Sequence, residues 1–171
     1  MEKHSDFITH INNKEDIIYL KNKHFPVNMR LFKTSKEYKD IILSQCKYIE
    51  KLCLNEKEGY KKPHGMSSAN AGLSFNIIGI TCNRNTKNEY CKIMINPIIN
   101  EYFGDQIISK SNCGSLTLKE SINIKRSNGI NVTYYDINGD INRQDITRKN
   151  GSLSIQHEID HNLGILIIDR I

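Results

Sequence analysis

Two histidines and a glutamate near the end of the chain could bind and use a metal ion. They lie in Gln156-His157-Glu158-Ile159-Asp160-His161, which contains the pattern HExxH. In a helix, residues four positions apart project from the same face, so His157 and His161 can bind one metal ion together. Glu158 is offset from this face and can take a proton from a water molecule that the metal activates. The alternative is a surface helix whose histidines are neighbours without binding metal.

A catalytic metal of this kind needs a third protein ligand and an open position for water. Ten residues follow His161, too few for the downstream glutamate of thermolysin-like enzymes. The longer pattern HExxHxxGxxH is matched through Gly164, but Ile167 stands at its last position, and an alkyl side chain cannot bind metal. The third ligand is therefore expected upstream, with Asp169 as the alternative.

Most upstream candidates have a structural explanation. Two cysteines on the apolar side of a predicted helix and two at predicted strand ends are expected to be packing residues; they are Cys46, Cys53, Cys82 and Cys91. Three histidines in the N-terminal segment are expected in solvent: His4, His10 and His24. Cys113 differs because it lies in a turn before a predicted strand, where a thiolate can face a metal held by a helix. A thiolate with two imidazoles suits Fe(II), Zn(II), Co(II) or Ni(II) better than magnesium or calcium.

The elements that must position these residues follow from the periodicity of the apolar side chains. Thr34-Ser35-Lys36-Glu37 indicates a capping box, and helical spacing predicts a helix from about 35 to 54. The polar stretch 55–65 predicts a loop. Runs rich in Ile, Val and Tyr then predict strands, at 75–82, 92–98, 105–109, 121–125, 130–136 and 141–147.

The last two predicted strands are joined by Asp136-Ile137-Asn138-Gly139, which is typical of a tight hairpin turn. Helical spacing returns through Leu153 to Leu163, and Gly164 predicts the end of this second helix. The order predicts an α+β fold of mostly antiparallel sheets packed around the near-C-terminal HExxH helix, with a long helix in the N-terminal half.

Length and composition favour a single domain over residues 1–171, with 1–16 as a loosely ordered extension. The net charge of +5 comes from scattered basic residues, which favours a solvated surface over a nucleic-acid interface. No apolar run is long enough to span a bilayer, and no secretory signal is evident. The five cysteines contain no CxxC pair, which favours a reducing compartment.

A cysteine-containing turn followed by QHExDH resembles the peptide deformylase family, which removes the N-formyl group from nascent polypeptides. The third family motif is intact at 156–161. The second, usually Glu-Gly-Cys-Leu-Ser, falls on Ser111-Asn112-Cys113-Gly114-Ser115. The first, usually Gly-Leu-Ala-Ala-x-Gln, falls on Gly65-Met66-Ser67-Ser68-Ala69-Asn70. The resemblance implies that Cys113 is the third metal ligand.

This chain departs from the family pattern in the first two motifs. Asn70 replaces a glutamine whose amide helps to bind the reacting carbonyl oxygen, so the same group stands on a shorter stem. Ser111 replaces a glutamate that braces the site against a basic residue, for which Arg126 is the nearest match. Glu120 falls where many members carry an arginine that contacts the substrate backbone.

The resemblance also implies the roles of the remaining residues. Glu158 passes the proton of the attacking water to the leaving amine, while Asn70 and the Gly114 N–H bind the developing oxyanion. Gly65, Leu153 and Ser154 contact the substrate, with ordinary core packing as the alternative for the last two. One divalent ion is expected, with Fe(II) as the native metal and Zn(II), Ni(II) or Co(II) as alternatives. The family resemblance predicts a cytoplasmic monomer acting on N-formylated peptides at the ribosome exit, or an organellar enzyme whose presequence has been removed.

Three rival functions stay open at this stage. The first is a deformylase-like protein that keeps the metal but has weak, altered or no deformylase activity. The second is an HExxH endopeptidase, against which the absent downstream ligand argues. The third is a noncatalytic domain with a structural metal, which would need a fourth protein ligand.

Overall fold

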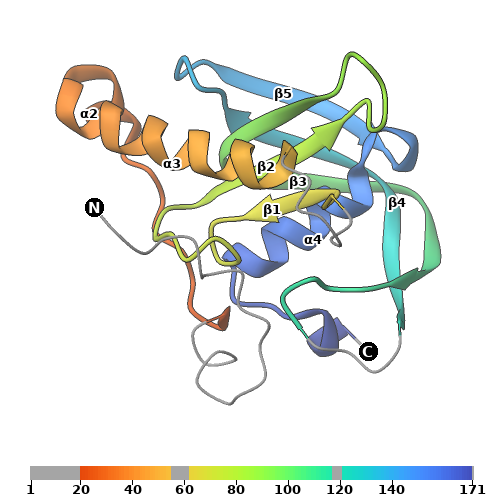
Figure 1. Ribbon diagram of the computed structural model, residues 1–171. Coiled ribbons are helices and arrows are strands. Elements are labelled where there is room, and N and C mark those ends of the chain that lie inside the picture. Colours follow the sequence, from red (N-terminus) through yellow and green to blue (C-terminus); the bar gives the residue numbers. More distant parts are fainter. Residues whose placement is uncertain (1–19, 55–61, 117–120, 171) are drawn as a thin grey trace.

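The computed structural model describes residues 20–54, 62–116 and 121–170 of the chain (Figure 1). The expected N-terminal extension at 1–16 lies outside these residues, as do His4, His10, Glu120 and most of the predicted loop at 55–65. Everything below concerns the described residues.

Five antiparallel strands form one sheet in which each strand pairs with its neighbour in sequence. They are β1 (Gly65–Ser67), β2 (Ile77–Cys82), β3 (Tyr90–Ser111), β4 (Ile122–Tyr135) and β5 (Ile141–Thr147). The predicted hairpin turn between the last two strands is confirmed. Gly139 adopts a φ of 86°, and the Asp136 carboxylate accepts hydrogen bonds from the N–H groups of Asn138 and Asp140.

The prediction of six strands was wrong in number because two pairs of predicted strands are continuous. Segments 92–98 and 105–109 belong to β3, and segments 121–125 and 130–136 belong mostly to β4. The boundaries between these predicted segments lie at or near irregularities in the β3–β4 register, between Ile95/Ile98, Ile99/Glu101 and Phe103/Gln106. Pro97 and Gly104, the latter with a φ of 70°, therefore mark bulges inside a long bent strand rather than turns between strands.

The long N-terminal-half helix is confirmed as α3 (Lys36–Leu54). It starts at Ser35, whose hydroxyl accepts the N–H of Tyr38, while Thr34 donates to the Arg30 carbonyl instead of capping α3. The short α2 (Met29–Thr34), capped by the Asn28 side chain, was not predicted. Cys46 and Cys53 lie on the buried face of α3, as expected, and Cys82 and Cys91 lie at strand ends.

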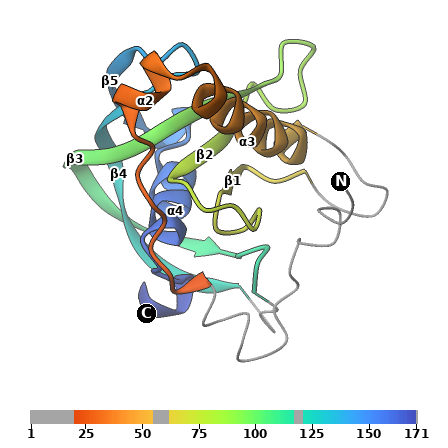
Figure 2. The ribbon, with the colours of Figure 1, turned by 90° about the vertical axis from the view of Figure 1, so that its left-hand side faces the viewer.

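The second predicted helix is α4 (Ser152–Asn162), preceded by the 3-10 turn Arg148–Asn150. The helices α3 and α4 cover opposite faces of the sheet (Figures 1 and 2). Along β2, Ile77 packs with the α3 cluster, whereas Ile78 and Ile80 pack with Ile155 and Ile159 of α4. This alternation follows from the opposite directions of successive side chains in a strand. The predicted α+β architecture is confirmed.

The chain leaves α4 at Gly164, as predicted. Its φ is 76°, and the Ile165 N–H bonds back to the Asp160 carbonyl at 2.8 Å. A Cβ at Gly164 would collide with the Lys21 carbonyl, so this position needs glycine for space as well as for conformation. The 3-10 turn Ile167–Arg170 follows. No helix in the described segments is long and apolar enough to cross a membrane.

Candidate metal centre

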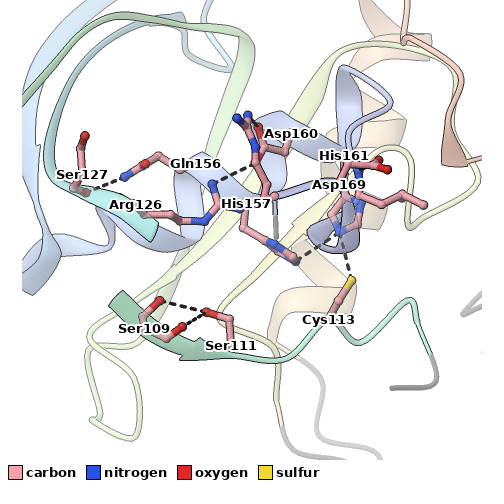
Figure 3. Close-up of polar contacts among 12 residues, drawn as sticks. Ser109, Ser111, Cys113, Arg126, Ser127, Gln156, His157, Asp160, His161 and Asp169 are labelled. Carbon is pink, nitrogen blue, oxygen red and sulfur yellow. Dashed lines mark hydrogen bonds and ion pairs between the residues drawn. The ribbon is translucent and has the colours of Figure 1, made fainter. Parts of the chain in front are cut away.

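The helix α4 presents its two histidines to the same point in space. The Nε2 atoms of His157 and His161 lie 3.2 Å apart, and their rings meet edge to face with centroids 4.6 Å apart (Figure 3). This placement follows from the helix itself, because residues four apart lie one above the other on one face. The sequence interpretation of HExxH as a paired ligand set therefore has the required geometry.

Cys113 completes the group from a different part of the chain. It lies two residues after the end of β3, its side chain is buried, and its Sγ lies 3.2 Å from His161 Nε2 (Figure 3). The three ligand atoms all lie within 4.8 Å of one another. In a tetrahedral site the metal–nitrogen bond is about 2.05 Å and the metal–sulfur bond about 2.3 Å. Two ligand nitrogens are then about 3.3 Å apart, and a nitrogen and a sulfur about 3.6 Å apart. The group therefore fits a divalent metal ion.

Glu158 lies beside this group but faces β1. A Cβ at Gly65 would fall 2.8 Å from Glu158 Cγ and 3.1 Å from its Oε1, so the absence of a side chain at Gly65 makes room for the carboxyl group. Burial raises the pKa of Glu158 to about 8, while hydrogen bonds from Ser67 and the charge of Arg126 oppose that rise. Its Oε2 is buried and has no hydrogen-bond partner among the described residues. A buried carboxyl with a raised pKa and a free oxygen suits a general base.

Comparison with known proteins agrees with this geometry. The sequence profile of polypeptide deformylases matches residues 16–171. The chain belongs to the polypeptide deformylase family. A peptide deformylase from Karelsulcia muelleri (strain GWSS) is 36% identical over 150 residues, covering 77% of each protein. The family resemblance inferred from the three motifs is thereby confirmed.

Solved deformylase structures share the fold. The match to a probable peptide deformylase from Synechococcus phage S-SSM7 has a TM-score of 0.68 at 19% identity and covers 95% of this chain and 97% of that one. A class I type b peptide deformylase from Acinetobacter baumannii, in its K3U-bound structure, gives a TM-score of 0.69 at 21% identity, covering 95% and 98%. At these identities the likeness establishes the fold alone.

Without a metal ion, burial keeps the three candidate ligand side chains uncharged. It raises the pKa of the Cys113 thiol to about 11, with hydrogen bonds from Ser115 opposing the rise. Burial lowers the pKa of His161 to about 4 and that of His157 well below its usual value. Neutral imidazoles are ready to bind metal, whereas the thiol must lose its proton, so metal uptake is expected to release one.

A buried ion-pair network holds α4 in place. Asp160 accepts from Arg126 at 2.9 Å and from Arg170 at 2.5 Å, and the side chains of Asp160 and Arg126 are 8% and 6% exposed. The resemblance implied a brace between the position of Ser111 and Arg126, but Ser111 instead bonds with Ser109 at 3.0 Å (Figure 3). The second nitrogen of Arg126, Nη2, is buried without a partner. In this chain the bracing partner of Arg126 is therefore Asp160, a residue of the HExxH helix.

The first family motif forms β1 and the turn that follows it. Ser68 donates its hydroxyl and its N–H to the Ile77 carbonyl, both at 3.0 Å, and the Ala71 N–H bonds to the Ser67 carbonyl. Asn70 sits half-buried in this turn, and its Oδ1 is buried without a hydrogen-bond partner. The structure thus anchors the backbone of the motif while leaving the Asn70 amide oxygen unpaired.

The other residues named from the sequence have varied positions. Gly114 is exposed next to Cys113, and a Cβ there would have no atom of the described residues within 4 Å. Leu153 and Ser154 lie half-buried in the first turn of α4, one turn before His157 and Glu158 respectively. Their roles in substrate binding stay predictions.

Two expectations need correction. His24 is not fully solvated, because it is half-buried and burial lowers its pKa; its backbone N–H donates to the Asn162 carbonyl at 2.9 Å. Asp169, the alternative third ligand, pairs with Lys21 and accepts the Leu166 N–H, and it is not part of the ligand group. Sequence reasoning also assigned no role to Asp160 or Asn162. The available signal was their type, since a carboxylate or amide that a helix carries into the core requires partners.

Proposed function

We propose that this member of the polypeptide deformylase family is a metal-dependent hydrolase that removes the N-formyl group from the N-terminal formylmethionine of nascent polypeptides. The observation that carries the proposal is the group of Cys113, His157 and His161, in which Cys113 and His161 are buried and His157 is half-buried, with Glu158 directly after His157 in α4. In the same family, a deformylase from Acinetobacter baumannii has been solved with Met-Ala-Ser bound, which supports a peptide substrate.

Cys113, His157 and His161 would hold one divalent ion, for which we propose Fe(II) as the native metal and Zn(II), Ni(II) or Co(II) as substitutes. Such an ion supplies Lewis acidity, which polarises a carbonyl group and lowers the pKa of water. Asp160 supports the ligands through the helix, because its ion pairs with Arg126 and Arg170 fix the rotation and depth of α4.

Glu158 moves the proton in the proposed reaction. Its carboxylate takes a proton from water as the water oxygen bonds to the formyl carbon. It then delivers that proton to the amine nitrogen as the C–N bond breaks, releasing formate and a free N-terminus. In the metal-free chain burial raises the pKa of Glu158, and a carboxyl group with a raised pKa can both accept and return a proton. The hydrogen bonds from Ser67 and the charge of Arg126 oppose this effect of burial.

The Gly114 N–H and the Asn70 amide are the proposed donors to the oxygen that becomes negative during attack. Gly114 lies next to a ligand at an open position, and Asn70 lies in the turn held against α4. Gly65, Leu153 and Ser154 are the proposed substrate contacts. The departures at Asn70 and Ser111 favour one alternative, a deformylase-like protein that keeps the metal with weak or altered activity.

Turnover of formyl-Met-Ala-Ser decides between these two functions. The chain is loaded anaerobically with Fe(II), Ni(II) or Zn(II), its metal content is measured, and release of formate is followed. We expect the native chain to bind one metal ion and to release formate. Glu158→Ala should keep the metal ion but lose formate release. Full metal occupancy without formate release from the native chain would overturn the proposal and favour the alternative.

A further inference from the structure

Asn162, the last residue of α4, places a fully bonded amide in the core directly after the ligand His161. Its side chain is buried, with 2% of the residue exposed. Its Oδ1 accepts the Ala69 N–H at 3.2 Å, and its Nδ2 donates to the Ile77 carbonyl and to Asn76 Oδ1, both at 3.0 Å. Burying an amide is costly unless each polar atom has a partner, so this arrangement depends on all three contacts.

One of these contacts reaches the turn that carries Asn70. Ala69 is the residue before Asn70, and its hydrogen bond to Asn162 joins the turn to the helix that carries the metal ligands. The Ile77 carbonyl, which Asn162 also holds, accepts the N–H and the hydroxyl of Ser68 in the same turn. Asn162 therefore contacts both sides of the turn at its base.

The Asn70 side chain has little else to fix it. Its Oδ1 has no hydrogen-bond partner among the described residues. Within these residues Asn70 forms one hydrogen bond, in which its backbone N–H donates to the Ser67 hydroxyl at 3.4 Å. An oxyanion donor must lie about 2.7–3.1 Å from the developing charge. The Asn70 side chain is short and has two rotatable bonds. The backbone of the turn therefore mainly sets the location of its amide group.

We propose that Asn162 is a positioning residue, which fixes the Ala69–Asn70 backbone against the metal helix and thereby sets the position of the Asn70 amide donor. The proposal rests on the function proposed for Asn70. Asn162 itself touches no reacting group. Its carbonyl also accepts the His24 N–H at 2.9 Å, so the N-terminal segment is fastened to the same residue.

Asn162→Leu tests the proposal because leucine has a similar volume but leaves the Ala69 N–H without its acceptor. With metal-loaded protein and formyl-Met-Ala-Ser, kcat should fall roughly 10- to 100-fold, the range expected from a misplaced reacting group, while metal content stays unchanged. In an Asn70→Ala background the same substitution should cause no further fall, because the group that it positions has been removed. Asn162→Asp, which keeps an acceptor for Ala69, should recover part of the loss.

Asn96→Gly is the matched control. Asn96 makes two hydrogen bonds of 2.8 Å to the backbone of Val27, and its φ of 51° is one that glycine readily adopts. It belongs to the same asparagine-rich region through its N–H bond to the Asn76 carbonyl, but it does not contact Ala69. We expect Asn96→Gly to lower Tm and leave kcat unchanged. An equal fall in kcat for Asn96→Gly would show general destabilisation and overturn the proposal.

Amide hydrogen exchange keeps the inference separate from the proposed activity. In Asn162→Leu the Ala69 amide should exchange at least about tenfold faster, whereas amides in the middle of α4 should not change. Equal protection of the Ala69 amide in the native chain and in Asn162→Leu would overturn the proposal that Asn162 fixes the turn, whether or not formate is released. If Asn162→Leu lowers kcat equally in the native and Asn70→Ala backgrounds, Asn162 does not act through Asn70. Absence of turnover in the native chain would count against the proposed function instead.

Discussion

Gly65→Ala should displace the Glu158 carboxyl without touching a metal ligand. The added Cβ would fall 2.8 Å from Glu158 Cγ, 3.0 Å from Ile80 Cδ1 and 3.1 Å from Glu158 Oε1. Ordinary van der Waals contact begins at 3.4 Å, so relief by Glu158 alone requires a shift of about 0.6 Å or more. Ile80 closes another side, which leaves movement of the carboxyl group as the main way to relieve the clash.

The size of the effect follows from this shift. A misplacement of about 1 Å can cost roughly 10²-fold in rate, and complete loss of a general base costs roughly 10²–10⁴-fold. We therefore expect kcat of Gly65→Ala to fall roughly 10- to 100-fold, less than in Glu158→Gln. Metal content should remain that of the native chain, because the three atoms nearest to the new methyl group belong to Glu158 and Ile80 and not to a ligand residue.

The assay compares four proteins: the native chain, Gly65→Ala, Glu158→Gln and the double variant. Formate release from formyl-Met-Ala-Ser gives kcat and KM, and elemental analysis gives the metal content. If Gly65→Ala acts through Glu158, the double variant should be no slower than Glu158→Gln alone. An additional fall in the double variant, or native kcat in Gly65→Ala, would refute the reasoning. A raised KM with unchanged kcat would instead assign Gly65 to substrate binding.

Three further predictions concern the ligands, the brace and the base. Cys113→Ala should lose most bound metal in elemental analysis and equilibrium dialysis, and full occupancy at native affinity would exclude Cys113 as a ligand. Asp160→Asn should destabilise the chain by about 3–5 kcal/mol in urea unfolding, because it leaves the buried Arg126 without its charge partner; an unchanged midpoint would contradict this. In metal-free protein the folded pKa of Glu158, about 8, lies above its usual 4.5, so its deprotonation disfavours folding and stability should fall as pH rises through that interval. Glu158→Gln should not show this fall in Tm with pH. The titration of the histidines contributes equally to both proteins, so the difference between their Tm values isolates Glu158. Parallel curves of Tm against pH would argue against the raised pKa.

The features that the sequence predicted correctly are those that local periodicity controls. The spacing of His157 and His161 specifies one helix face, because the helical repeat is fixed by backbone geometry. Gly139 and Gly164 mark a hairpin turn and a helix end, since both adopt positive φ angles. The long helix α3 follows in the same way from its apolar stripe.

Local signals gave the wrong result where a tertiary contact outweighs them. Segments 92–98 and 105–109 were predicted as separate strands, yet β3 continues through Pro97 and Gly104 because pairing with β4 supplies hydrogen bonds on either side of each irregularity. The short helix α2 was missed because six residues carry too little periodicity to recognise. His24 was placed in solvent because no periodic pattern surrounds it, whereas its burial comes from contacts with residues far along the chain.

For the candidate site, the sequence by itself determined which residues can act on a metal and a proton: two imidazoles, one thiol and one carboxyl group, in motifs that identify the family. Only the tertiary structure decided how they are held. The Asp160–Arg126 pair spans two elements, and the Asn162–Ala69 bond joins residues 93 positions apart. The physical reason is that ligand identity is a property of side-chain chemistry, whereas the pKa of Glu158 and the position of the Asn70 turn depend on burial and on partners that local sequence does not specify.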